Sequence, residues 1–171
     1  MSILEFRQTV RRLSHHIKEL ETAGLVEIVW SVGLAGQLTV TTWVVSRWLA
    51  DKLPWASITP VVYIPIVGNI LVPLAGVPLG HEALSWAFYG IGAFFWPVVT
   101  AMILVRQAQQ PIPDRLAASW FILIAPPSVA GSSALALGAP ATVGFAALGV
   151  ATLMLLAAAT RVPTLLKSPF A

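Results

Sequence analysis

The side chains that most often carry out catalysis are few in this sequence and lie far apart. Glu27, His81, Glu82 and Asp114 are scattered along the chain. They form no HExxH motif, no carboxylate pair at helical spacing and no Ser/His/Asp arrangement. The chain also contains no cysteine, which excludes a disulfide framework and a thiolate metal site. We therefore expect no enzyme, no metal centre and no cofactor.

A different kind of chemistry, that of backbone groups freed inside an apolar helix, is better represented. With a rotation of about 100° per residue, the helix predicted near 58–77 places small, polar and helix-breaking residues within an arc of about 140° on one side. These residues are Pro65, Gly68, Asn69, Val72 and Pro73. Proline frees a carbonyl and bends the helix axis, and lipid cannot satisfy the freed group. An asparagine at about bilayer depth is equally costly in lipid. We expect this face to point at protein or water.

The same pattern recurs later in the chain, where Pro126 and Pro127 precede Gly131. The stretches on either side have few such breaks. We therefore predict that two broken helices line a pathway and two smooth ones cover them. The predicted pathway-lining residues are Pro65, Gly68, Asn69, Val72, Pro73, Pro126, Pro127 and Gly131. Small residues and proline also serve packing between membrane helices, and this alternative stays open.

The elements that must position these residues are membrane helices. Hydrophobic residues make up 57% of the 171 residues and charged ones 10%, whereas soluble domains carry about 25% charged residues. Continuous apolarity without strict alternation argues against a β-barrel. We predict an all-α integral membrane protein, with an amphipathic basic segment at 1–22 and a transmembrane domain at 23–171. Five spans of about 20 residues are expected near 24–48, 58–77, 83–105, 115–137 and 141–166.

Basic residues beyond the N-terminal segment gather in three places beside the predicted helices. They are Arg47, Lys52, Arg106, Arg115, Arg161 and Lys167. The opposite loops, 78–82 and 138–140, contain no Lys or Arg, so the positive-inside rule predicts that the three basic places are cytoplasmic. This distribution explains the pI of about 9.8 without nucleic acid as a partner.

The N-terminal segment conflicts with this topology. Five spans would place its four basic residues outside, unless the first span, which contains Glu27 and Gln37, does not cross. Both options stay open, and protease access to the N-terminus distinguishes them. The apolar residues of this segment share one helical face, which suits a membrane surface or a connector helix. His15 and His16 are adjacent and do not share a face, so they predict no metal site.

Two runs of residues resemble a known family. The run from Thr59 to Gly76, TPVVYIPIVGNILVPLAG, is similar to the signature helix of the tellurite-resistance/dicarboxylate transporter family. The run from Trp120 to Ser128, WFILIAPPS, is similar to its later proline-containing helix. This family includes bacterial tellurite-resistance permeases, malic acid and sulfite transporters, and plant slow anion channels. The similarity extends from about Val29 to the end of the chain.

The resemblance implies a ten-helix subunit of five helical hairpins, with kinked inner helices around a pore and frequent assembly as trimers. Our spans would form the middle of this fold, and the two broken helices would be inner ones. The family's pore-blocking phenylalanine belongs to its ninth helix, which would follow Ala171, so Phe170 does not take that role. The resemblance therefore implies a partial chain, working with a complementing chain or as a homo-oligomer.

The function that follows is transmembrane transport of small anions, as a channel or a carrier. The resemblance implies malate-like dicarboxylates or inorganic anions as substrates, a link to tellurite resistance, and a multi-pass position in the plasma membrane, such as the bacterial inner membrane. Two alternatives stay open: a membrane assembly or regulatory subunit without transport, and an inactive remnant of a truncated gene. A membrane enzyme ranks behind these, because the sequence lacks a polar catalytic cluster.

Overall fold

The computed structural model describes residues 3–50 and 54–167, with side chains for 24–50, 54–163, 165 and 166. The apolar face predicted for the N-terminal segment, together with His15 and His16, lies outside the described side chains. All regular elements in the described ranges are helices. The chain divides into two compact units, residues 1–35 and 36–171, and helix α1 (Ile3–Leu49) contributes to both. Every site discussed below belongs to the second unit.

The predicted all-α membrane architecture is confirmed. Within the described residues, four helical stretches are long and apolar enough to cross a membrane: Gly24–Leu49 of α1, Glu82–Gln109 (α4), Asp114–Ala136, and Ala141–Ala159 (α6). The fifth predicted span is a shorter apolar stretch, Pro60–Gly76. The chain continues after α6 into the short helix α7 (Val162–Lys167).

The two stretches that carry several internal prolines are not regular α-helices, whereas α4, with Pro97 alone in its interior, is continuous. Pro60–Gly76 consists of four short pieces: η2 (Pro60–Val62), α2 (Tyr63–Val67), η3 (Gly68–Leu71) and α3 (Pro73–Gly76). Asp114–Ala136 consists of a 3-10 helix, η4 (Asp114–Ile124), and an α-helix, α5 (Ala125–Ala136). We refer to them as the first and second broken helices. The change from 3-10 to α geometry falls directly before Pro126 and Pro127, which donate no backbone hydrogen bond.

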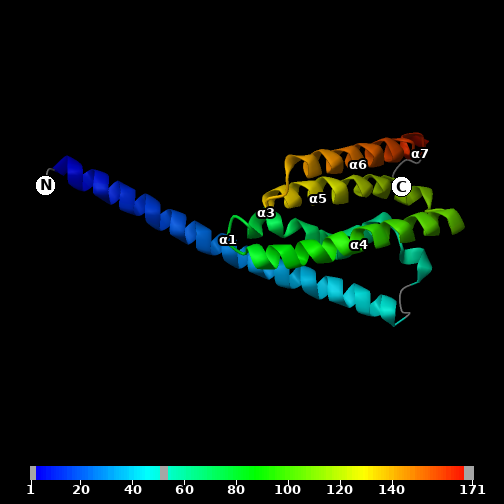
Figure 1. Cartoon of the computed structure of the whole chain (residues 1–171), viewed down its shortest axis with the longest axis horizontal. Helices are drawn as coiled ribbons and strands as arrows, with labels where there is room; N and C mark the ends of the chain where they lie inside the picture. The colour runs from blue at the N-terminus through cyan, green and yellow to red at the C-terminus, as the bar shows by residue number, and fades with distance from the viewer. Residues whose placement is uncertain (1–2, 51–53, 168–171) are drawn as a thin grey trace. The chain divides into compact units, whose positions relative to one another are not determined.

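Within the second unit, the helices pack side by side (Figure 1). α4 packs along the first broken helix, and α6 packs along the second. A buried apolar cluster that includes Ile66, Val67, Val99 and Ile103 joins α4 to the first broken helix. Gly80 and Gly138 have φ values of 83° and 87°, a region that glycine enters without strain, and they mark the turns before α4 and α6.

Two close approaches depend on glycine. A Cβ atom on Gly92 of α4 would lie 2.7 Å from the backbone nitrogen of Ile70. A Cβ atom on Gly131 of α5 would lie 2.5 Å from the Cβ of Ala147 on α6. Because both distances are below any van der Waals contact, only glycine permits these helices to approach so closely. Small residues play this packing role in membrane proteins generally.

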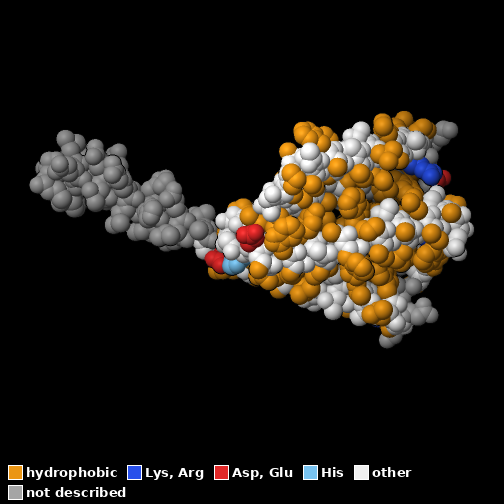
Figure 2. Space-filling view, viewed as in Figure 1, with side chains coloured by type: hydrophobic (Ala, Val, Ile, Leu, Met, Phe, Trp, Pro, Cys, Tyr) orange, Lys and Arg blue, Asp and Glu red, His pale blue; other side chains and the backbone are white. Residues whose placement is uncertain are grey.

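Much of the outer surface is apolar, as Figure 2 shows in orange. On α6, Phe145 is 72% exposed, Leu148 61% and Leu156 63%. A soluble domain rarely exposes so many large apolar side chains on one helix. A lipid environment removes the cost of this exposure, in agreement with the multi-pass membrane architecture.

Candidate pathway between the broken helices

The first broken helix leaves carbonyl groups without their usual helical donors. Pro73 has no N–H to donate to the carbonyl of Asn69, which accepts instead from Val72 N at 3.3 Å, closing a tighter turn. Earlier in the same helix, the carbonyls of Ile64 and Pro65 lie where α-helical geometry gives way to 3-10 geometry. Such carbonyls need donors from elsewhere in the protein, because lipid offers none.

Two side chains of α1 supply those donors. Gln37 Nε2 donates to the carbonyl oxygen of Pro65 at 3.1 Å and to that of Ile64 at 3.4 Å. The hydroxyl of Thr41 lies 2.7 Å from the same Pro65 oxygen. Asn69 is fully buried and donates through Nδ2 to Thr41 Oγ1 at 2.8 Å and to the carbonyl of Ile66 at 2.8 Å. We call Gln37, Thr41 and Asn69 the polar clamp. It joins α1 to the first broken helix at the carbonyls beside the change from α to 3-10 geometry.

A second tie joins the two broken helices. Ser133 of α5 is fully buried and donates through Oγ to the carbonyl of Ile70 at 2.6 Å. The neighbouring Ser132 is exposed and bonds only to Ser128 of its own helix, at 3.1 Å. The backbone of the first broken helix is thus held from two sides, by α1 and by α5.

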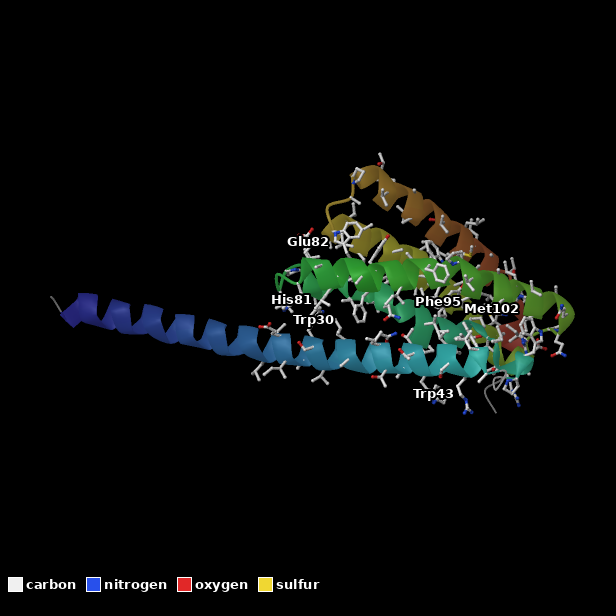
Figure 3. The ribbon with its side chains drawn as sticks, turned by 60° about the horizontal axis from the view of Figure 1, so that its bottom comes forward. Trp30, Trp43, His81, Glu82, Phe95 and Met102 are labelled. Carbon is white, nitrogen blue, oxygen red and sulfur yellow. The ribbon has the colours of Figure 1, made fainter. Side chains whose placement is uncertain are left out.

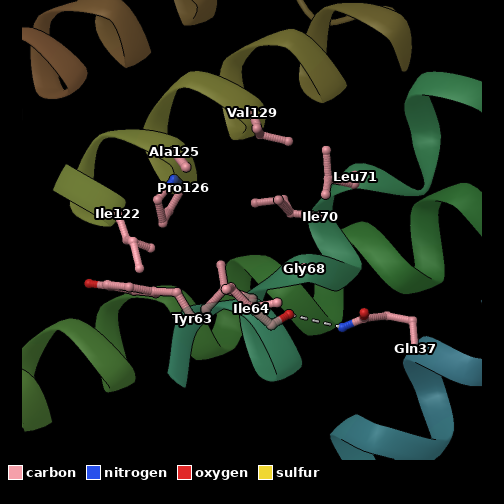
Figure 4. Close-up of a pocket in the computed structure, with 11 residues that line it drawn as sticks. Gln37, Tyr63, Ile64, Gly68, Ile70, Leu71, Ile122, Ala125, Pro126 and Val129 are labelled. Carbon is pink, nitrogen blue, oxygen red and sulfur yellow. Dashed lines mark hydrogen bonds between the residues drawn. The ribbon is translucent and has the colours of Figure 1, made fainter. Parts of the chain in front are cut away.

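A pocket of about 190 Å³ lies between the two broken helices, with Gln37 at its edge (Figure 4). Its wall is almost entirely apolar and includes Ile64, Leu71, Ala125 and Val129. Two polar side chains border it, and both are engaged elsewhere. Gln37 donates to the Pro65 carbonyl, and the Tyr63 hydroxyl lies 2.6 Å from Thr100 Oγ1 on α4. None of the described residues that line this pocket is charged.

The eight residues predicted to line a pathway divide into two groups. Gly68 and Pro126 border the pocket. Asn69, Pro73 and Pro127 are fully buried in helix contacts, and the carbonyl of Pro65 is taken by the clamp. Val72 is half-buried, and Gly131 packs against α6 beside a separate cavity of about 380 Å³. The structure therefore brings only two of the eight together at this pocket.

Sequence reasoning missed the apolar wall residues and the role of Gln37. Ile64 and Leu71 are 61% and 51% exposed on the pocket side of the first broken helix, but nothing in their type distinguishes them from core residues. Gln37 did carry a signal, because an amide inside an apolar span requires a partner. The sequence did not indicate that this partner is the backbone beside Pro65.

The two ends of the second unit differ in charge. His81 and Glu82 mark one end of α4, whereas Met102 lies toward the other (Figure 3). At that other end, Arg106 occupies the last turn of α4 and donates through Nη2 to the carbonyl of Ala56 at 3.2 Å. The guanidinium carbon of Arg161 lies 5.5 Å from the ring centroid of Trp120. We call this the basic end.

Comparison with known proteins gives one informative match. Neither the curated proteins nor the solved structures contain a match to this chain. Among protein families, the model described as "Voltage-dependent anion channel" matches residues 7–166. The match covers both broken helices, the polar clamp and the basic end, and it confirms the resemblance seen in the two proline-containing runs. Members of this family are membrane channels and transporters for anions, and this chain belongs to the voltage-dependent anion channel family.

Proposed function

We propose that this chain forms part of a passive pathway for small anions, whose wall is the pocket-facing side of the two broken helices. The observation that carries the proposal is the pocket itself, which lies between the only two proline-broken helices in the described part of this anion channel family member. The proposed wall residues are Ile64, Gly68, Leu71, Ala125, Pro126 and Val129. The buried prolines and Asn69 would shape these helices instead of contacting the anion.

The composition of the pocket favours passage over tight binding. Fast conduction requires sites that an ion can enter and leave, and a fixed charge in an apolar wall would hold an anion strongly. The described lining has no such charge, and the polar groups nearest to it are already bonded. Positive potential from the basic end would raise the local concentration of anions. Malate-like dicarboxylates and small inorganic anions both fit this scheme.

We further propose that the chain works in a plasma membrane and as an oligomer, a trimer in the related proteins, or with a complementing chain. Support comes from the exposed side of the first broken helix, where Ile64 and Leu71 have no protein neighbour covering them fully. A wall built from two helices needs further helices to enclose a pathway. Chemical cross-linking of the chain in native membranes tests this part.

The wall assignment can be tested with thiol chemistry, because the chain has no cysteine. Single variants Ile64→Cys and Leu71→Cys introduce the only thiol in an otherwise unreactive protein. In membranes, a negatively charged methanethiosulfonate reagent should modify both positions, and an excess of malate or chloride should slow the modification. Leu148→Cys on α6, 61% exposed like Ile64, is the matched control and should stay unmodified in lipid. Equal reaction at Leu148 and Ile64 would contradict the wall assignment.

A flux assay addresses the function directly. The full chain is reconstituted in liposomes and the release of malate or chloride is followed. A bulky side chain that protrudes into the pocket, as in Ala125→Trp, should lower any measured flux strongly. The matched control, Ala157→Trp, places the same bulk on an exposed position of α6 and should leave the flux unchanged. If both variants behave alike, the pocket is not the pathway.

A further inference from the structure

The described part of the chain contains six buried side-chain atoms without a hydrogen-bond partner, and four of them are N–H donors near the basic end. These four are Arg47 Nε, Trp48 Nε1, Arg106 Nε and Arg106 Nη1. The other two, Asn69 Oδ1 and Ser85 Oγ, lie apart from this group. Buried donors without acceptors are rare in folded proteins, so their concentration at one end calls for a physical reason.

Arg106 is the most unusual of these residues. Its side chain is 4% exposed, and within the described part of the chain it donates one hydrogen bond, from Nη2 to the Ala56 carbonyl at 3.2 Å. A guanidinium group offers five N–H donors and does not lose its proton in proteins. No described carboxylate accepts from Nε or Nη1. A full positive charge is therefore buried with only a neutral carbonyl to compensate it, which is costly in a low-dielectric setting.

The surroundings of Arg106 indicate which chemical group suits it as a hydrogen-bond acceptor. Ile103, one turn earlier on α4, belongs to the apolar cluster that also contains Ile58 and Ile112, and Trp48 packs against that cluster. Trp48 thus brings an unpartnered indole N–H to the same apolar cluster. A partner with several acceptor oxygens and a negative charge would satisfy the Nε and Nη1 donors of Arg106. We propose that Arg106 is an oxyanion-binding site at the basic end, which takes a carboxylate or a phosphate group.

Access to the site requires a small local movement, because Arg106 Nε and Nη1 are covered by protein. The turn Trp55–Ser57 contains no buried residue, and its Ala56 carbonyl is held to Arg106 by one long hydrogen bond. An incoming oxyanion can replace that carbonyl as the acceptor, so the turn yields at little cost. Segments with few buried contacts are the ones that open locally in proteins.

The site is tested by binding, which does not depend on whether the chain conducts anions. The full chain is placed in nanodiscs of phosphatidylcholine and titrated with succinate and with inorganic phosphate, while intrinsic tryptophan fluorescence and the unfolding temperature are followed. We expect saturable binding with a rise in unfolding temperature. In Arg106→Gln the affinity should fall at least about tenfold, because charge-assisted hydrogen bonds are lost.

Two further variants keep the test decisive. Arg115→Gln removes the same charge at the same end from an exposed side chain, and it should change the affinity less than about twofold. Arg106→Lys keeps the charge and the fold but loses the planar set of donors, and it should bind measurably but more weakly than the native chain. An equal loss in Arg115→Gln and Arg106→Gln would overturn the proposal, because general charge attraction would then explain the binding.

The source of the oxyanion is distinguished by a lipid series. If phosphatidylglycerol raises the unfolding temperature of the native chain but not that of Arg106→Gln, and succinate adds nothing, the site takes a lipid phosphate. If succinate and phosphate act equally in both lipids, the site takes a soluble anion. Asp51 lies outside the described residues, and Asp51→Asn tests whether a carboxylate of the chain itself is the acceptor. If Asp51→Asn destabilises the chain as much as Arg106→Gln, and neither anion nor lipid has an effect, the proposal is wrong.

Discussion

The first broken helix, Pro60–Gly76, and the smooth helix α6 are both apolar, but they relate to their surroundings in opposite ways. In the first broken helix the fully buried side chains include Pro60, Ile66, Asn69, Ile70 and Pro73. In α6 only Ala151 and Ala158 are buried. The broken helix depends on neighbours for its backbone hydrogen bonds, whereas α6 satisfies its own. A helix with breaks in it must be surrounded by protein, and a regular one can face lipid.

The largest loss of stability is expected from replacing Gly92, where α4 approaches the first broken helix. A Cβ atom at this position would lie 2.7 Å from the backbone nitrogen of Ile70, and backbone cannot move aside easily. We expect Gly92→Ala to destabilise the chain by about 3 kcal/mol, the upper range for overpacking. Gly90→Ala is the control on the same helix, because a Cβ atom there meets nothing within 4 Å. Unfolding by SDS in mixed micelles measures both, and equal stability of the two variants would contradict the packing argument.

Removal of Asn69 tests the polar clamp. In Asn69→Ala, Thr41 and the Ile66 carbonyl lose their donor and a small cavity forms in a fully buried place. We expect the free energy of unfolding to fall by about 1–2 kcal/mol. A hydrogen bond between membrane helices contributes less than about 1 kcal/mol on average, and the cavity adds to this loss. Thr152→Val on α6 removes a hydrogen bond within one helix, to Leu148, at an exposed position. It should have almost no effect in the same SDS titration.

The neighbouring serines of α5 give the most closely matched pair. Ser133→Ala removes the bond to the Ile70 carbonyl, which joins the two broken helices, and should cost about 1 kcal/mol. Ser132→Ala removes only a bond to Ser128 on its own helix and should lie within about 0.3 kcal/mol of the native chain. If Ser132→Ala has the larger effect, the tie between the broken helices does not contribute to stability.

The smallest effect is expected on α6 itself. Leu148→Ala exchanges one apolar side chain for a smaller one at a position that is 61% exposed. In lipid or micelles no apolar surface is transferred from water, so the loss should stay below about 0.5 kcal/mol. Ile66→Ala, a fully buried position of the first broken helix, should cost about 2 kcal/mol or more by comparison. Similar losses at both positions would remove the distinction between the two helices.

Several features of the fold and the candidate site followed from particular residues. The long uncharged stretches predicted the helices, and Pro65, Pro73, Pro126 and Pro127 predicted which two of them are broken, because proline lacks a backbone N–H. The single Pro97 leaves α4 continuous. Other features did not follow. The pocket wall contains ordinary residues such as Ile64 and Leu71, and Asn69, predicted to line a pathway, is fully buried in the clamp. Helical periodicity groups residues on a face but does not say which neighbour the face meets.

The sequence by itself determined that the chain is a membrane protein of the anion channel family, since apolarity, proline positions and the two family runs are properties of the linear chain. Only the tertiary structure decided which polar groups meet. Gln37 and Thr41 reach the carbonyl of Pro65 across 24 to 28 positions of sequence, and Arg106 meets the carbonyl of Ala56 across 50. Contacts over such separations depend on how helices pack in three dimensions, where glycines such as Gly92 set the distance between them.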